Sequence, residues 1–268
     1  MRTLRLMVVS LALAGIWACE APEPGAEPED ATVGLDASLL EDHEFEDPDV
    51  TRVHREMIRT IAPDGGWENA RYLEFDWVVR PDDDPMVRSH RFDRWEGRAR
   101  VEMSQDDGEL VASFPVDAPE DGTAELDGEP LEGDEAREAL EGAHRAHIND
   151  SYWLLMPYKW ADPGVTAEYV GEEDDDGQTW EVVELRFDDV GLTPDNVYRA
   201  FVNTESGRME RWHHYQDADA DPSPAEWVEW EAFGPIQLAT RRERDGELFI
   251  GFENIRVEEE VPSGALDP

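Results

Sequence analysis

Hydrophobic residues near the start of the folded region recur at intervals of three and four positions. In the stretch 47–61 they are Val50, Val53, Met57 and Ile61, and this spacing places side chains on one face of a helix. An Asp-Pro pair precedes them, which suits an N-cap followed by the first helical residue. The pattern predicts an amphipathic helix over 47–61, ended by a Pro-Asp-Gly-Gly sequence.

The pattern then changes to the two-residue alternation of β-strands. Leu73, Phe75 and Trp77 alternate with the acids Glu74 and Asp76, so the apolar side chains share one face of a strand. Short turns rich in Asp, Gly and Pro separate several such stretches, as in antiparallel hairpins. The predicted strands are 73–79, 99–103, 110–114, 166–170, 179–187, 197–203, 208–215, 226–233, 236–242 and 248–257.

A second helix is predicted from Asp134 to about Asn149, and it leads into the most hydrophobic stretch of the mature chain, 151–160. Pro157 and the Asp-Pro-Gly sequence at 162–164 are expected to prevent a long regular helix there. The elements together predict an α+β domain. It contains a single curved antiparallel sheet of about ten strands, an incomplete β-barrel, with helices packed in or across its concave face.

The N-terminus carries the features of an export signal. A basic start precedes an apolar run at 6–16 that is too short for a permanent membrane span, and Cys19 follows in the sequence Ile-Trp-Ala-Cys. This resembles the lipobox of bacterial lipoproteins, whereas the alternative is an ordinary secretory signal with an incidental cysteine. The predicted organisation is a signal peptide at 1–18, a lipidated Cys19 with an acidic tether at 19–46, and one domain at 47–268.

This organisation predicts an exported protein anchored by lipid at the periplasmic face of a membrane or on the cell surface. The outer membrane is favoured over the inner one. The membrane partner is then reached through Cys19 rather than through the folded domain.

Composition narrows the choice of partners. The 268 residues carry a formal net charge of −43, which excludes nucleic acid as a partner and excludes electrostatic adhesion to anionic lipid. One cysteine excludes an internal disulfide and a multi-thiolate metal site. The excess of acid and the single lysine, Lys159, indicate adaptation to high salt. A GC-rich genome is the alternative for the missing lysines, although it does not explain the excess acid.

Several motifs in the C-terminal half resemble an uncharacterised family of exported bacterial proteins. The longest reads Asn-Asp-Ser-Tyr-Trp-Leu-Leu-Met-Pro-Tyr-Lys at 149–159, and shorter ones stand at 162–165, 190–194, 234–236, 252–254 and 261–262. The architecture of that family is similar to the lipoprotein-localisation carriers of the LolA/LolB type. The resemblance implies an incomplete barrel closed by helices, and in those carriers an apolar cavity that holds acyl chains. It transfers no binding residue by position.

Common catalytic signatures are absent from the sequence, and no catalytic residue, cofactor or metal site is predicted. His144 and His147 stand three residues apart on the second helix, but no third ligand accompanies them. His213 and His214 are adjacent on a strand and therefore face opposite sides. The acidic stretches at 172–177 and 217–221 lack the later ligands of a calcium loop and are interpreted as solvated turns.

The hydrophobic stretch offers the candidate binding residues. They are Tyr152, Trp153, Met156, Tyr158, Lys159 and Trp160. The aromatic residues and Met156 either line an apolar pocket or fill the barrel as core. Lys159 either meets an anionic headgroup or pairs with a neighbouring acid.

Three functions follow from these alternatives. The first is non-catalytic binding of an apolar or amphiphilic ligand, a lipid or acyl chain. The second is a structural or assembly lipoprotein with a solid core that acts through a protein partner. The third is a hydrolase that uses a base such as His147 or His213.

Overall fold

The computed structural model describes residues 39–79, 85–105, 107–175, 177–188, 192–193, 195–217 and 219–267. The predicted signal peptide, Cys19 and most of the predicted tether lie outside the described residues, as do parts of the motif at 190–194. No helix within the described ranges is both long and apolar enough to span a bilayer.

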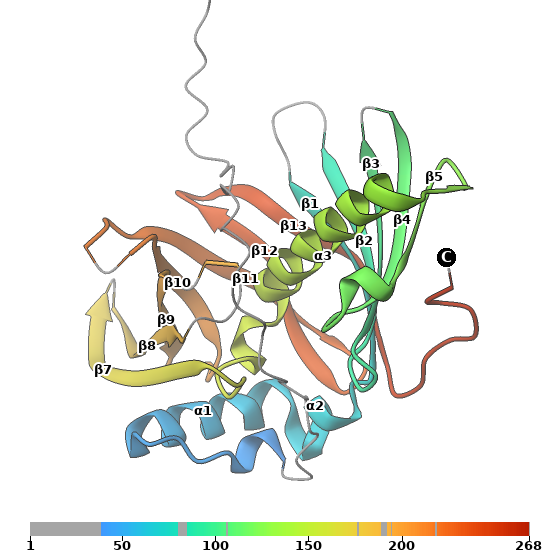
Figure 1. The fold of residues 1–268 in the computed structure, drawn as a ribbon. Helices are drawn as coiled ribbons and strands as arrows, with labels where there is room; N and C mark the ends of the chain where they lie inside the picture. The colour runs from blue at the N-terminus through green and yellow to red at the C-terminus, as the bar shows by residue number, and fades with distance from the viewer. Residues whose placement is uncertain are drawn as a thin grey trace, which may run out of the picture. The chain divides into compact units, whose positions relative to one another are not determined.

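A single antiparallel sheet of thirteen strands forms the body (Figure 1). Its order is β6-β5-β4-β3-β2-β1-β13-β12-β11-β10-β9-β8-β7. The chain therefore runs outward from β1 to one edge of the sheet, crosses over, and returns from the other edge to place β13 beside β1. The large sheet curls, as expected for so many twisted strands, and the predicted α+β architecture of one curved antiparallel sheet is confirmed.

The first six strands lie on one side of the β1–β13 contact and the other seven on the opposite side. The bounds are β1 Tyr72–Val79, β2 Met86–Asp93, β3 Arg98–Gln105, β4 Gly108–Pro115, β5 Thr123–Leu126, β6 Glu129–Pro130, β7 Val165–Asp175, β8 Gln178–Phe187, β9 Val197–Asn203, β10 Met209–Tyr215, β11 Ser223–Phe233, β12 Ile236–Arg244 and β13 Glu247–Glu258.

The predicted count of about ten strands is too low by the strands β2, β5 and β6. β2 was missed because its inward positions include Arg88 and His90, so it lacks an apolar alternation. β5 and β6 span only four and two residues, which is too short for a two-residue period to stand out.

The first predicted helix is α1 (Pro48–Ile61). Asp47 caps it, because its Oδ1 accepts a hydrogen bond from the Asp49 N–H at 2.9 Å. The other carboxylate oxygen accepts from the N–H of Tyr169 at 3.1 Å. Asp47 therefore also accepts a hydrogen bond from the backbone of the edge strand β7. An unpaired N–H on an edge strand can pair with another chain, and this bond removes one such donor.

Short helical turns flank α1 on both sides. η1 (Leu40–Asp42) falls within the range predicted as tether and contacts α1 through an ion pair between Glu41 and Arg59 at 2.5 Å. η2 (Pro63–Gly65) and α2 (Gly66–Asn69) follow α1. A Cβ on Gly66 would lie 2.2 Å from the Pro235 carbonyl oxygen, so this close approach requires glycine.

The second helix, α3 (Gly133–Leu155), makes the crossover between the two sheet edges. Its 23 residues span about 35 Å, and it lies across the concave side of the sheet (Figure 1). The helix continues about six residues beyond the predicted end. The α-helix ends at Leu155, two residues before Pro157. Pro157 itself lies in the first turn of the 3₁₀ helix η4 (Met156–Tyr158), where a proline is tolerated.

Two hydrophobic clusters lie on the concave side. The larger joins α1, the end of α3, η4, β1 and the strands β8–β13, and the smaller joins the first half of α3 to β3, β4 and β5. The end of α3 and η4 thus fill space that a hollow barrel would leave open.

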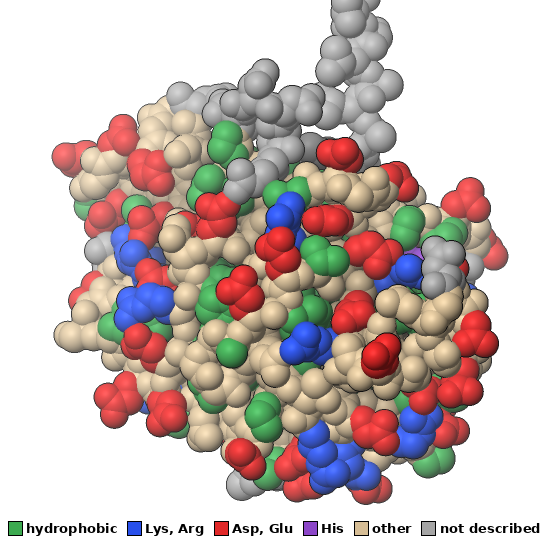
Figure 2. All heavy atoms as spheres, turned by 180° about the vertical axis from the view of Figure 1, so that it is seen from behind, with side chains coloured by type: hydrophobic (Ala, Val, Ile, Leu, Met, Phe, Trp, Pro, Cys, Tyr) green, Lys and Arg blue, Asp and Glu red, His purple; other side chains and the backbone are tan. Residues whose placement is uncertain are grey.

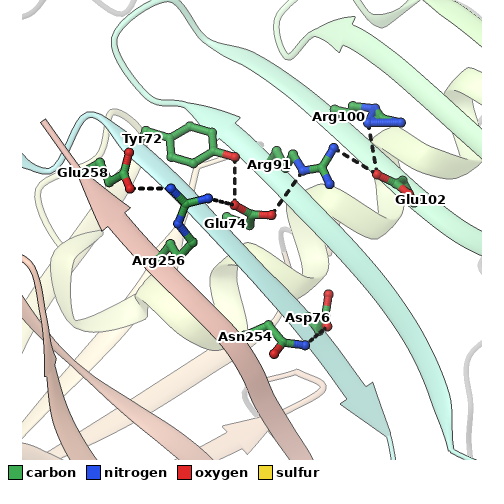
Figure 3. Close-up of polar contacts among 9 residues, drawn as sticks. All are labelled: Tyr72, Glu74, Asp76, Arg91, Arg100, Glu102, Asn254, Arg256 and Glu258. Atoms are coloured by element: carbon green, nitrogen blue, oxygen red, sulfur yellow. Dashed lines mark hydrogen bonds and ion pairs between the residues drawn. The ribbon is translucent and has the colours of Figure 1, made fainter. Parts of the chain in front are cut away.

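Along β13, β1, β2 and β3, the opposite, outer face of the sheet is polar. An alternating series of acids and arginines, named here the outer ladder, crosses β13, β1, β2 and β3 (Figure 3). Its spacings range from 2.5 Å to 3.3 Å, and the Tyr72 hydroxyl donates to Glu74 at 3.1 Å. Its members are Glu258, Arg256, Glu74, Arg91, Glu102 and Arg100. On the face that Figure 2 shows, acidic side chains are dispersed, and hydrophobic ones lie singly or in small groups between them.

Candidate functional site

The structure divides the six candidate binding residues into three groups. Met156, Tyr158 and Trp160 are buried in the larger core cluster. The Tyr158 hydroxyl donates to the Gln237 carbonyl at 2.6 Å and lies 3.0 Å from the Ile61 carbonyl oxygen. Burial raises the pKa of Tyr158 far above its ordinary value, so the phenol stays neutral and ties α1 to β12.

Lys159 lies apart from the core. It is half-buried, and its ammonium forms an ion pair with Asp162, three residues along the chain. The cation is therefore engaged with an acid of the adjoining turn.

Tyr152 and Trp153 belong to a half-buried group of rings on the concave side. The Trp153 ring centre lies 4.2 Å from that of Trp212 and 5.8 Å from that of Phe249, both in edge contacts. Tyr152 lies 5.9 Å from Phe187 and 5.5 Å from Tyr198. We call the half-buried rings of this group the aromatic surface, and the buried Trp212 lies beneath them. Its members are Tyr152, Trp153, Phe187, Tyr198 and Phe249.

The aromatic surface keeps its two phenols neutral. Burial raises the pKa of Tyr152 well above 10, and it also raises the pKa of Tyr198. Rings with a polar tip on an apolar body suit the boundary between an apolar ligand and water. The arrangement therefore offers a contact surface rather than an acid or a base at neutral pH.

A buried arginine supports Trp153 from below. Arg242 is fully buried, and its Nε and Nη2 donate to the Trp153 carbonyl, the first at 3.1 Å. Its guanidinium lies 3.5 Å from the ring centre of Trp227 and 4.9 Å from that of Phe252. Burial lowers the pKa of this guanidinium well below its ordinary value. No carboxylate in the described part of the chain pairs with it.

A second polar cluster lies beneath α3 on strand β2. Arg88 holds Asp150 through two bonds, Nε to Oδ2 at 2.7 Å and Nη2 to Oδ1 at 2.6 Å. His90 Nε2 lies 2.9 Å from the same Oδ2, and both His90 and Asp150 are 0% exposed. The His147 ring lies 5.8 Å from that of His90. This cluster fastens α3 to the sheet.

His144, His147, His213 and His214 are partly or fully buried. Burial lowers the pKa of His147 well below 6.5, and it also lowers those of His144, His213 and His214. Within the described ranges, no group of three or more His, Cys, Asp or Glu residues is arranged to hold a metal ion. His213 packs on Phe201 and His214 on Tyr198, which places them on opposite sides of β10.

Sequence reasoning did not identify Arg88, His90, Asp150 or Arg242. Asp150 and His147 stand at helical spacing on one element, which is a weak signal that two polar side chains share a face. Arg242 gives no signal in the sequence, because its partners are backbone carbonyls.

Two hollows lie elsewhere on the body. One of about 310 Å³ is formed by β8, β10 and β11 with the turn before β10, and one of about 90 Å³ lies between α1 and the strands β8 and β9. None of the six candidate residues lines either hollow.

Comparison with known proteins gives similarities of fold alone. No protein-family model matches the chain, and no curated protein matches it. Among solved structures, the chain is similar to a DUF1329 family protein from Desulfovibrio piger, with 12% identity and a TM-score of 0.46 over 82% of this chain and 97% of that one. It is also similar to a LolA superfamily protein from Nitrosomonas europaea, with 10% identity and a TM-score of 0.49 over the same shares of the two chains.

The lipoprotein LppX from Mycobacterium tuberculosis is a more distant similarity, with 12% identity and a TM-score of 0.29 over 81% of this chain and 98% of that one. The C-terminal motifs resemble the LolA/LolB type, and one of these similar structures is of a LolA superfamily protein. These likenesses concern the course of the chain and identify no ligand.

Proposed function

We propose that this chain is an exported lipoprotein, held at a membrane through Cys19, that binds an apolar or amphiphilic ligand without catalysis. The observation that supports the proposal is the aromatic surface on the concave side of the sheet. Its rings are half-buried and adjoin the core, so they offer apolar area without forming part of a closed interior.

The surface is rigidly built, which favours binding because less side-chain freedom is lost when a ligand docks. Trp153 is fixed by Trp212 and by the hydrogen bonds from Arg242 to its carbonyl. Tyr198 lies 5.0 Å from the same Trp212 ring. An acyl chain or another flat apolar group would contact ring faces and edges, while the tyrosine hydroxyls meet its polar end.

The solid-core alternative has its own support. Met156, Tyr158 and Trp160 fill the concave side instead of lining a cavity. In that case the chain would act through a protein partner at its surface, and the aromatic surface would take up no acyl chain.

Binding of a fluorescent fatty acid separates the two functions. The probe is cis-parinaric acid, added to the mature chain carrying Cys19→Ser so that no attached lipid competes. We expect saturable binding that weakens at least tenfold in Trp153→Ala, a loss of about 1.4 kcal/mol. Trp95→Ala is the matched control, because Trp95 is 42% exposed and lies outside the aromatic surface.

Near-ultraviolet circular dichroism establishes that each variant is folded, and Tyr198→Phe gives a second, milder change at the same surface. Equal binding by the parent and by Trp153→Ala, or no saturable binding at all, would contradict the proposal and favour the solid-core protein.

The membrane anchor is tested separately. Cells grown with labelled palmitate should incorporate the label into the chain and lose it in Cys19→Ser. Mass spectrometry of an unmodified mature N-terminus would overturn the anchor and leave the ligand proposal standing.

A further inference from the structure

The hollow of about 310 Å³ is separate from the aromatic surface and shares no residue with it. It lies at the lower end of the range of about 300–1,000 Å³ for small-molecule sites. Trp180 and Trp230 line it, together with the polar side chains of Gln178, Arg208 and Glu210. With Trp227, the lining contains three indole rings and several polar groups, which is the usual composition of a ligand site.

Hydrogen-bond donors around this hollow lack acceptors. Trp180 is 2% exposed, yet its Nε1–H has no partner, and the same holds for Nε1 of Trp230 and Nε of Arg208. Unpaired buried donors cost free energy. The Nε1–H of Trp227, another residue of the lining, also has no partner, so four such donors belong to residues around one hollow. A ligand that brings acceptors to them would relieve this cost.

Acceptors with spare capacity lie beside the donors. Glu210 accepts from the side chains of Asn203 at 2.9 Å and Ser206 at 2.8 Å. Among the described residues, no Lys or Arg forms an ion pair with it. Glu226 pairs with Arg211 at 2.7 Å. A carboxylate offers about four acceptor positions, so Glu210 can take further donors from a ligand.

We propose that this hollow binds a neutral saccharide. A sugar hydroxyl donates and accepts at the same time, so it can meet both the unpaired N–H groups and Glu210. The apolar C–H face of a sugar ring can pack on an indole ring. A simple cation would leave the donors unpaired, and an anion would be repelled by Glu210, Glu226 and Glu229 around the hollow and by the net charge of −43.

Isothermal titration calorimetry with the mature chain tests this site. The probes are maltose, cellobiose and N,N′-diacetylchitobiose, with a glycan array to extend the panel and spermidine as a cationic comparison. We expect saturable binding of at least one saccharide, with the same affinity at low and at molar NaCl because the ligand is uncharged. Trp230→Ala should weaken that binding at least tenfold, and Glu210→Gln should weaken it as well.

Glu231→Gln is the matched control, because Glu231 is exposed on β11, the strand of Trp230, and does not line the hollow. Both substitutions remove one negative charge. A difference in saccharide affinity between the two variants therefore reports the contacts of Glu210 and not the net charge. Two results would overturn the proposal. One is that no saccharide is retained on the array or in solution, and the other is that only spermidine binds and is released by salt. Neither result affects the fatty-acid measurement at the aromatic surface.

Discussion

The two faces of the sheet use the same ion-pair chemistry under opposite conditions. On the concave face, Arg88 holds Asp150, whose side chain is 0% exposed. On the outer face, Arg91, three residues along the same strand, holds Glu74, which is 25% exposed. Removing one partner of a buried pair leaves a charge without solvent, whereas an exposed charge regains water. We therefore expect burial, rather than geometry, to decide how much each ion pair contributes to the free energy of unfolding.

The largest effect is expected at the buried pair. Asp150→Asn removes the carboxylate that Arg88 and His90 share, so we expect the free energy of unfolding to fall by about 3–5 kcal/mol. Urea denaturation measures this loss. Asp134→Asn is the control on the same helix, because its ion pair with Arg137 is exposed, and it should cost less than about 1 kcal/mol. Equal effects of the two variants would show that burial does not set the contribution.

An intermediate loss of stability is expected at acid pH, from protonation of His54. His54 lies on the buried side of α1, its ring nitrogens have no partners, and burial lowers its pKa to about 3. The unfolded chain binds the proton more readily, so this contribution is complete above about pH 6.5 and declines as the pH falls toward about 3. At pH 5 the loss from His54 is about 2 kcal/mol.

Denaturation at neutral pH and at pH 5 measures this contribution. In His54→Phe the decline between the two pH values should be smaller by about 2 kcal/mol. Other histidines, His147 among them, also have lowered pKa values, so the variant still loses some stability at pH 5. An unchanged pH dependence in the variant would place the acid sensitivity at those residues instead.

The contrast between the faces also explains which parts of the fold the sequence predicted. Strands with an apolar inner face, such as the one containing Leu73 and Phe75, were identified from alternation alone. β2 was missed because Arg88 and His90 occupy its inner positions, and their partner Asp150 lies about 60 residues further along the chain. A periodicity rule detects apolar faces and therefore overlooks a face that buries charge.

The candidate site was predictable only as a segment. Hydrophobicity selected the stretch 151–160, but it could not divide Tyr152 and Trp153 from Met156, Tyr158 and Trp160. That division depends on where α3 ends and on which residues then turn into the core. The rings that complete the aromatic surface come from β8, β9 and β13, and their meeting is set by the crossover of α3.

The smallest effect is expected in the outer ladder, and it requires a double-mutant cycle. Glu74→Gln removes the ion pairs with Arg91 and Arg256, which lowers stability. It also removes one of the many negative charges of a chain of net charge −43, which raises stability. Combined with Arg91→Gln, the cycle isolates the coupling between them, expected at about 0.2–1 kcal/mol at low salt. It should vanish in molar NaCl, where the Debye length is about 3 Å.

The parent chain should respond to salt in the opposite direction. Screening of the net charge raises its melting temperature between low and molar NaCl, even though each exposed pair then contributes less. Glu231→Gln removes one negative charge without changing the outer ladder. Its effect on the melting temperature therefore measures the general repulsion between charges. A coupling between Glu74 and Arg91 that persists in molar salt would mean that the outer face is shielded from solvent ions. The contrast with Asp150 would then rest on local geometry rather than on burial.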